Sequence, residues 1–137
     1  MHPQRIVILC LALLGIASVF IPWYTFEVLF VKTSVNGMEG NGALFLILFF
    51  IVLLLTLLYE RNSRINGLNF WIMICTSGCA VILGAYELFS LANQSETLFG
   101  QLISEAIQPG IGLYVLIGSS FSIVLTLVLF PLFFRNK

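Results

Sequence analysis

Thr76-Ser77-Gly78-Cys79-Ala80-Val81-Ile82-Leu83-Gly84-Ala85-Tyr86-Glu87 is the stretch around which we expect the chain to pack, and it lies in the third of four long apolar runs. Thr76, Ala80 and Gly84 are four residues apart, so on an α-helix they form one ridge. Inside a bilayer, small residues at this spacing let two helices approach closely, because packing drives association there. The stretch therefore predicts a helix–helix interface within a membrane.

The fourth apolar run carries a second ridge of the same kind. Gly118, Ser122 and Thr126 are also four residues apart. If the third and fourth helices run antiparallel, Gly84 is expected near Gly118 and Thr76 near Thr126. The two ridges would line a substrate path or form a packing seam, and we favour the packing seam.

Composition identifies the class of protein. The chain has 137 residues, of which 60% are hydrophobic and 9% are charged, whereas soluble domains average about 45–50% and about 25%. We expect a single domain over residues 1–137, an all-α integral membrane bundle of four transmembrane helices. The expected spans are 6–24, 43–59, 68–91 and 111–134. The first run is interpreted as a retained helix, since no A-x-A-like cleavage site follows it.

Two loops between the spans carry structure of their own. Asn36-Gly37 is the commonest signal for a two-residue hairpin turn, so the first loop predicts a short β-hairpin on the membrane surface. The second loop predicts an interfacial amphipathic helix of about three turns, with Ser95 as its N-cap and Pro109-Gly110 after its end. Its apolar side would consist of Leu98, Phe99, Leu102, Ile103, Ala106 and Ile107.

The second and fourth runs begin alike. One starts Gly40-Asn41-Gly42-Ala43-Leu44 and the other starts Gly110-Ile111-Gly112-Leu113-Tyr114, and both are followed by an Arg-Asn pair. The similarity indicates either two parallel repeats of one helical hairpin or a chance use of glycine at two helix starts. The sequence leaves both interpretations open.

Basic residues are concentrated on one side. They fall at the termini and in the middle loop, and Lys32 is the exception; the others are Arg5, Arg61, Arg64, Arg135 and Lys137. Positive charge marks the cytoplasmic side. We therefore expect a multi-pass protein of the plasma membrane or the bacterial inner membrane, with both termini in the cytoplasm. The asymmetry argues against the dual-topology small multidrug-resistance and fluoride-channel families.

Glu87 is the most deeply placed charge. Counting ~20 residues from Leu68 puts it close to the outer interface and away from the midplane. A carboxylate within a span is a candidate proton or ion site. At this depth it is also explained by solvation or by pairing with Lys32, and we favour that structural interpretation.

No enzyme, cofactor or metal signature is present in the sequence. The single histidine is His2, and the three cysteines, Cys10, Cys75 and Cys79, lie within apolar runs, where we expect them to pack as small apolar side chains. Asn93-Gln94-Ser95 matches a glycosylation acceptor, and such tripeptides are common by chance. No basic block suits a nucleic acid.

The layout is similar to that of claudin-like tetraspans, with four helices, a β-prone first outer loop after a Trp-bearing helix end, and a second outer loop. The similarity concerns topology alone, since the paired cysteines of the claudin loop are missing from Thr25 to Gly42. We expect a non-enzymatic accessory subunit or oligomeric scaffold whose partners are the lipid bilayer and another membrane protein or itself. The alternative is a small transporter or channel subunit that uses Glu87.

Overall fold

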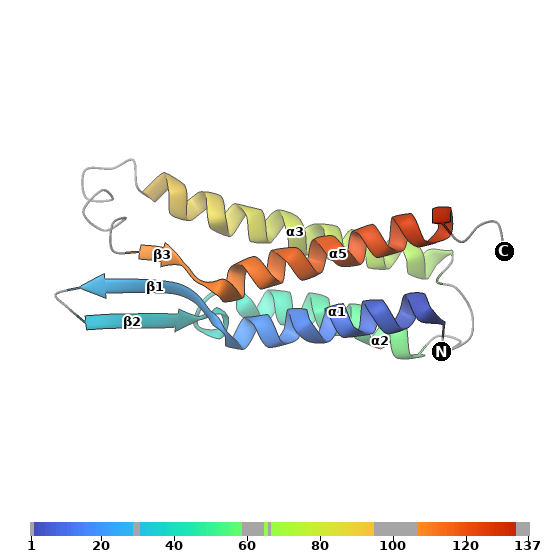
Figure 1. Cartoon of the computed structure of the whole chain (residues 1–137), viewed down its shortest axis with the longest axis horizontal. Coiled ribbons are helices and arrows are strands. Elements are labelled where there is room, and N and C mark those ends of the chain that lie inside the picture. The colour runs from blue at the N-terminus through green and yellow to red at the C-terminus, as the bar shows by residue number, and fades with distance from the viewer. Residues whose placement is uncertain (1, 29–30, 59–64, 66, 95–106, 134–137) are drawn as a thin grey trace.

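The computed structural model of the chain describes residues 2–28, 31–58, 65, 67–94 and 107–133. Most of them belong to four long helices that lie side by side along one axis (Figure 1): α1 (Pro3–Phe20), α2 (Gly42–Leu58), α3 (Leu68–Gln94) and α5 (Ile111–Phe133). α1 packs against α5 and α2, and α3 packs against α5 and α2. The fold is therefore mainly helical, as the sequence predicts.

Three of the helices are long and apolar enough to cross a membrane. They are α1, α5 and the segment Leu68–Ser90 of α3, whereas α2 has 17 residues and is a shorter apolar helix. Their ends follow from local chemistry. Proline stands at the start of α1, where its missing N–H is no loss. Pro22 begins the next element, so α1 ends at Phe20 and not at Tyr24 as predicted.

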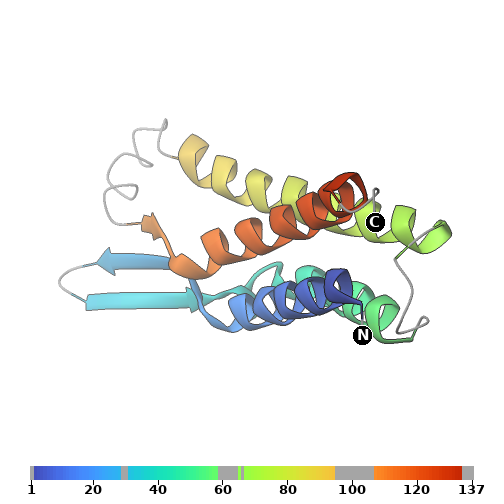
Figure 2. The ribbon, with the colours of Figure 1, turned by 45° about the vertical axis from the view of Figure 1, so that its right-hand side comes forward.

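A small antiparallel sheet lies at the end of the bundle away from the N-terminus (Figures 1 and 2). Its strands are β1 (Pro22–Val28), β2 (Val31–Asn36) and β3 (Ile107–Pro109), in the order β2-β1-β3. β1 follows α1 directly and forms the centre of the sheet. Both loops therefore contribute to one structure, and the second loop supplies its third strand.

The hairpin turn is not where the sequence places it. The β1–β2 register continues to Val28 opposite Val31, so the connection is 29–30. Gly37 instead begins the short 3₁₀ helix η1 (Gly37–Glu39), and among the described residues the glycine with positive φ is Gly67. The prediction at Asn36-Gly37 is thus wrong: a local turn preference gives way to the packing of Gly37 described below.

The predicted amphipathic helix falls mostly outside the described residues, which omit 95–106. Its last apolar residue, Ile107, belongs to β3 and lies opposite Phe26 of β1. At this point the chain is extended, because it completes the sheet.

The core is organised around α1 and not around α3. α1 buries small residues at a spacing of three, Ala12, Gly15 and Ser18. A Cβ on Gly15 would lie 2.6 Å from Cδ1 of Phe49, so the Phe49 ring of α2 fills the space above this glycine. The uniformly apolar composition of 44–58 predicts a peripheral helix with much lipid contact, but α2 takes part in the core. One of its faces is buried, comprising Gly42, Phe45, Phe49, Val52 and Thr56.

Candidate functional site

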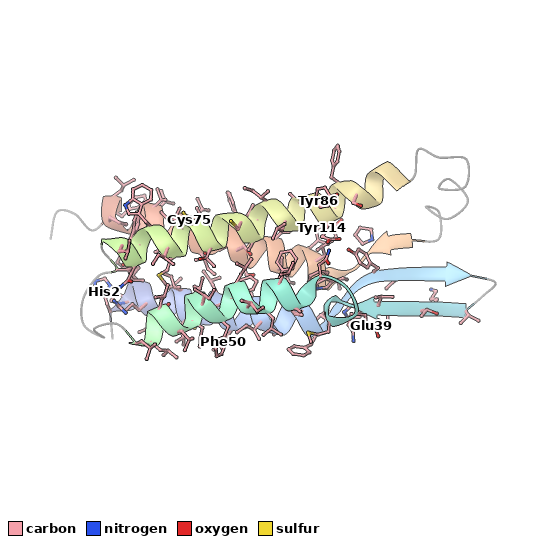
Figure 3. The ribbon with its side chains drawn as sticks, turned by 180° about the vertical axis from the view of Figure 1, so that it is seen from behind. His2, Glu39, Phe50, Cys75, Tyr86 and Tyr114 are labelled. Atoms are coloured by element: carbon pink, nitrogen blue, oxygen red, sulfur yellow. The ribbon has the colours of Figure 1, made fainter. Side chains whose placement is uncertain are left out.

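Glu87 joins three elements at the sheet end of the bundle. Its side chain comes from α3, and its two oxygens accept hydrogen bonds from Tyr24 Oη of β1 at 2.8 Å and from Asn41 Nδ2, just before α2, at 2.6 Å. The neighbouring Tyr86 lies on the outside of α3 (Figure 3). Glu87 thus ties the sheet to the ends of two helices through Tyr24 and Asn41, whereas the partner considered from the sequence was Lys32.

Tyr24 acts as a hydrogen-bond donor to Glu87. Burial, the hydrogen bond to Glu87 and the charge of that carboxylate all raise the pKa of Tyr24 well above its ordinary value. The phenol therefore stays protonated at any physiological pH, and its O–H donates a hydrogen bond to Glu87. A donor of this kind suits a fixed structural contact.

Trp23 fills the space beside this junction. Its side chain is 1% exposed, its Nε1 donates to the carbonyl of Ser18 at 2.9 Å, and its ring meets Phe45 edge to face at 5.3 Å between centroids. The amide of Gly110 donates to the Trp23 carbonyl at 2.5 Å. One aromatic residue therefore contacts α1, α2 and the segment that leads into α5.

Glycines make room for this ring. A Cβ on Gly37 would lie 2.7 Å from Trp23 Cζ2, and one on Gly112 would lie 2.9 Å from Trp23 Cδ1 and 2.7 Å from the carbonyl oxygen of Ile21. Real Cβ atoms do not approach so closely, so these positions accept no side chain without displacement. We call Trp23 and the two glycines Gly37 and Gly112 the tryptophan collar.

The contacts of Gly42 and Gly112 explain why the second and fourth runs begin alike. Gly42 and Gly112 occupy the first turns of α2 and α5, and both lie against the end of α1. A Cβ on Gly42 would lie 2.9 Å from Val19 Cγ1, and one on Gly112 would lie 2.9 Å from the Ser18 carbonyl oxygen. The same Cβ on Gly42 would also meet the carbonyl of Gly37, so this glycine is needed for α2 to start between η1 and α1, whereas Gly112 is needed for α5 to approach the backbone at the end of α1.

The predicted α3 ridge is inside the bundle. Thr76, Ala80 and Gly84 are all buried. A Cβ on Gly84 would lie 2.7 Å from Ile117 Cγ1 and 3.3 Å from Leu116 Cδ2, so this glycine packs directly on α5.

The predicted α5 ridge is not the surface that Gly84 meets. Gly118 is exposed, and a Cβ there would have no neighbour within 4 Å. Ser122 and Thr126 are half-buried and bond to carbonyls one turn back on their own helix. The pairing of Gly84 with Gly118 is therefore replaced by contact with Ile117, because α5 turns another face inward: Gly112, Leu113, Leu116, Ser119, Ser120, Ile123 and Leu127.

Gly84 and Gly118 form a matched pair of sites for a stability test. We expect Gly84→Leu to destabilise the protein by about 1–3 kcal/mol, because the new side chain overpacks the α3–α5 seam. Gly118→Leu adds the same side chain on an open surface and should cost nothing. Thermal aggregation in detergent compares the two variants, and equal transitions would contradict this seam.

The other end of the bundle holds a polar group that sequence reasoning missed. Gln4 and Arg5 are fully buried, and Arg5 Nη1 donates to the carbonyl of Thr56 near the end of α2 at 3.0 Å. The ring of His2 meets Phe130 of α5 edge to face at 5.4 Å. This contact could have been predicted from the polar residues in the first turn of an apolar helix. The last carbonyls of a neighbouring antiparallel helix lack partners within their own helix and need donors.

The cysteines do not pack in the core as expected. Cys10, Cys75 and Cys79 are free and exposed on the helix surfaces, with Cys75 on the outside of α3 (Figure 3). Within the described ranges no group of three His, Cys, Asp or Glu side chains is placed to hold a metal ion. Asn93 of the glycosylation tripeptide lies in the last turn of α3.

Comparisons with family models, with curated proteins and with solved structures give no match to this chain.

Proposed function

We propose that the chain is a non-enzymatic integral membrane protein that acts as an accessory subunit or oligomeric scaffold through its sheet end. The carrying observation is that both oxygens of Glu87 are engaged by Tyr24 and Asn41. A carboxylate with two fixed donors is suited to holding the sheet on the helices, and less suited to binding and releasing a transported ion.

The interior supports the same proposal. The described core is mainly apolar, and its hydroxyl groups mostly bond to carbonyls within their own helices, as Thr56, Thr76 and Ser120 do. Hydroxyls satisfied in this way do not offer a continuous row of ligands across the bundle. This favours a packed scaffold over the alternative, a transporter or channel subunit that uses Glu87.

The proposal includes four membrane spans with both termini in the cytoplasm. α2 has 17 residues, which is the short end of the spanning range, and its packing against α1 and α3 supports its place beside them in the bilayer. The sheet end would then face the outside of the cell. The concentration of basic residues at the termini and in the middle loop supports this orientation.

Single-cysteine labelling tests this orientation. On a background without the native cysteines, Ser34→Cys and Ser95→Cys are expected to react with an impermeant maleimide on intact cells, and Ser63→Cys is not. Permeabilisation should expose the third position. Labelling of Ser63→Cys in intact cells would overturn the orientation.

Isolation from native membranes in mild detergent tests the function. We expect a membrane protein, or further copies of this chain, to co-purify in fixed ratio. In proteoliposomes we expect no proton flux that depends on Glu87. A pH-dependent flux that Glu87→Gln abolishes would establish the transporter alternative instead.

The Glu87 junction also makes a stability prediction. Glu87→Gln presents an amide N–H₂ to one of two donors, and we expect a loss of about 1 kcal/mol after allowance for partial exposure. Glu39→Gln is the control, since Glu39 is exposed. Tyr24→Phe combined with Glu87→Gln should cost less than the sum of the single changes, because both changes affect the same hydrogen bond between Tyr24 and Glu87. Additive losses in thermal unfolding would show that the two groups act independently.

A further inference from the structure

Two buried polar side chains in the helices have open hydrogen-bonding atoms. Gln4 in the first turn of α1 is 1% exposed, and neither its Nε2 nor its Oε1 bonds to any described residue. Ser77 of α3 is 3% exposed, and its Oγ likewise bonds to none of them. Taking an amide or a hydroxyl out of water without a partner costs free energy, so buried groups of this kind normally have one.

Both side chains belong to the inward faces of their helices. Gln4 precedes Ile8 by one turn, Ser77 follows Met73 by one turn, and both Ile8 and Met73 are 0% exposed. Residues four apart lie on one face of a helix. α1 and α3 each pack against α2 and α5, so Gln4 and Ser77 enter the interior of the bundle from opposite sides.

The two positions lie toward the N-terminal end of the bundle. α1 and α3 begin at that end (Figures 1 and 2). Gln4 is in the first turn of α1, and Ser77 lies nine residues after the start of α3, which is about 14 Å along the helix. Toward the sheet, the buried hydroxyls of Ser18, Ser119 and Ser120 donate to carbonyls of their own helices.

We propose that water binds inside the bundle at Gln4 and at Ser77, so that the half next to the N-terminus is hydrated and the half next to the sheet is dry. A buried water makes about three hydrogen bonds to polar groups that otherwise lack partners. Gln4 offers both donors and acceptors, and so does a serine hydroxyl. A cation would bond only to Oε1 of Gln4 and an anion only to Nε2, whereas water bonds to both.

This inference goes beyond the proposed function, because it concerns a ligand of the interior and not the sheet end. Water held in one half of the bundle makes no continuous path across it. The scaffold role and the internal hydration can therefore fail separately, since co-purification of a partner does not depend on bound water.

Radiolytic footprinting in lipid nanodiscs tests the difference between the two halves. Brief X-ray exposure converts water into hydroxyl radicals, which oxidise the side chains nearest to a bound water. Met73 reports on Ser77, and Phe45, which meets Trp23 edge to face near the sheet, reports on the other half. Met73 is 0% exposed and Phe45 is 1% exposed, so bulk water reaches neither.

We expect Met73 to be oxidised about tenfold faster than Phe45, because only Met73 lies beside a site that holds water. Slow oxidation of both residues would show that the interior is dry throughout and overturn the proposal. Fast oxidation of both would show water in the two halves, which also overturns it and favours the transporter alternative.

Matched serine variants test the Ser77 site. Ser77→Ala removes the hydroxyl that holds the water, and we expect it to lower the oxidation rate of Met73 about threefold to tenfold. Ser120→Ala makes the same change at a hydroxyl that bonds within its own helix, and should leave that rate unchanged. If Ser77→Ala also leaves the rate unchanged, no water is held at Ser77.

Gln4→Leu tests the other site. We expect the oxidation rate of Ile8, one turn along α1, to fall about threefold to tenfold. The thermal unfolding transition should not rise, because water already satisfies the amide of the parent protein. An unchanged rate at Ile8 overturns this site. A higher transition temperature does so as well, because removing an unpaired buried amide stabilises a protein whereas removing a hydrated one does not.

Discussion

Replacement of Trp23 by alanine is expected to destabilise the protein by about 3–5 kcal/mol, the range for removing a large buried aromatic side chain. The loss combines a cavity with broken contacts. The indole N–H no longer satisfies the Ser18 carbonyl, the edge-to-face contact with Phe45 disappears, and Gly37 and Gly112 border an empty space. Thermal unfolding in detergent, followed by circular dichroism, measures the change.

Trp71 provides the control for this prediction. It is 63% exposed on the outside of α3, against 1% for Trp23. Trp71→Ala should therefore shift the transition far less when the protein is solubilised. Equal shifts for the two variants would show that the collar does not hold the sheet end together.

Gly112→Ala is the second large change, although it adds a single methyl group. The new Cβ would lie 2.7 Å from the Ile21 carbonyl oxygen and 2.9 Å from that of Ser18. These atoms belong to the backbone, so they yield less readily than a flexible side chain. We expect α5 to move away from α1, with a loss of about 1–3 kcal/mol.

Gly118→Ala in the same helix should act in the opposite direction. No atom lies within 4 Å of its Cβ position, and alanine favours a helix over glycine by about 1 kcal/mol. The two variants should therefore move the unfolding transition to opposite sides of the parent. A gain from Gly112→Ala would contradict the close approach of α5 to α1.

The sequence predicts the helices well, because each is a long apolar run bounded by proline, glycine or charge. It does not predict which face of α5 is inside. In a helix that is apolar on all sides, hydrophobicity gives no contrast between a buried face and an exposed one. Small residues were the available signal. They locate the interface correctly at Gly84, and they mislead at Gly118, which faces outward.

Counting along the third apolar run places Glu87 toward the far end of α3, as the structure has it, but the sequence does not indicate its partners. Tyr24 and Asn41 lie 63 and 46 residues away in the sequence, and no local pattern links them to α3. The hairpin turn was misplaced for the opposite reason: Asn36-Gly37 is a strong local turn signal, but the strands connect at 29–30. Gly37 is nevertheless needed beneath Trp23, so Gly37→Val should disturb this end by a clash with the ring and not by an unfavourable φ.

The central place of β1 has a consequence for biogenesis. β1 and β2 are adjacent in the chain, so both strands of this hairpin are synthesised within the first third of the protein. β3 is made only after α3, and at about 5–20 residues per second the second edge of β1 waits several seconds for its partner. A chain that stalls before Ile107 therefore lacks the strand that pairs with the second edge of β1. Such a nascent chain is a target for chaperones and proteases that recognise unpaired strands.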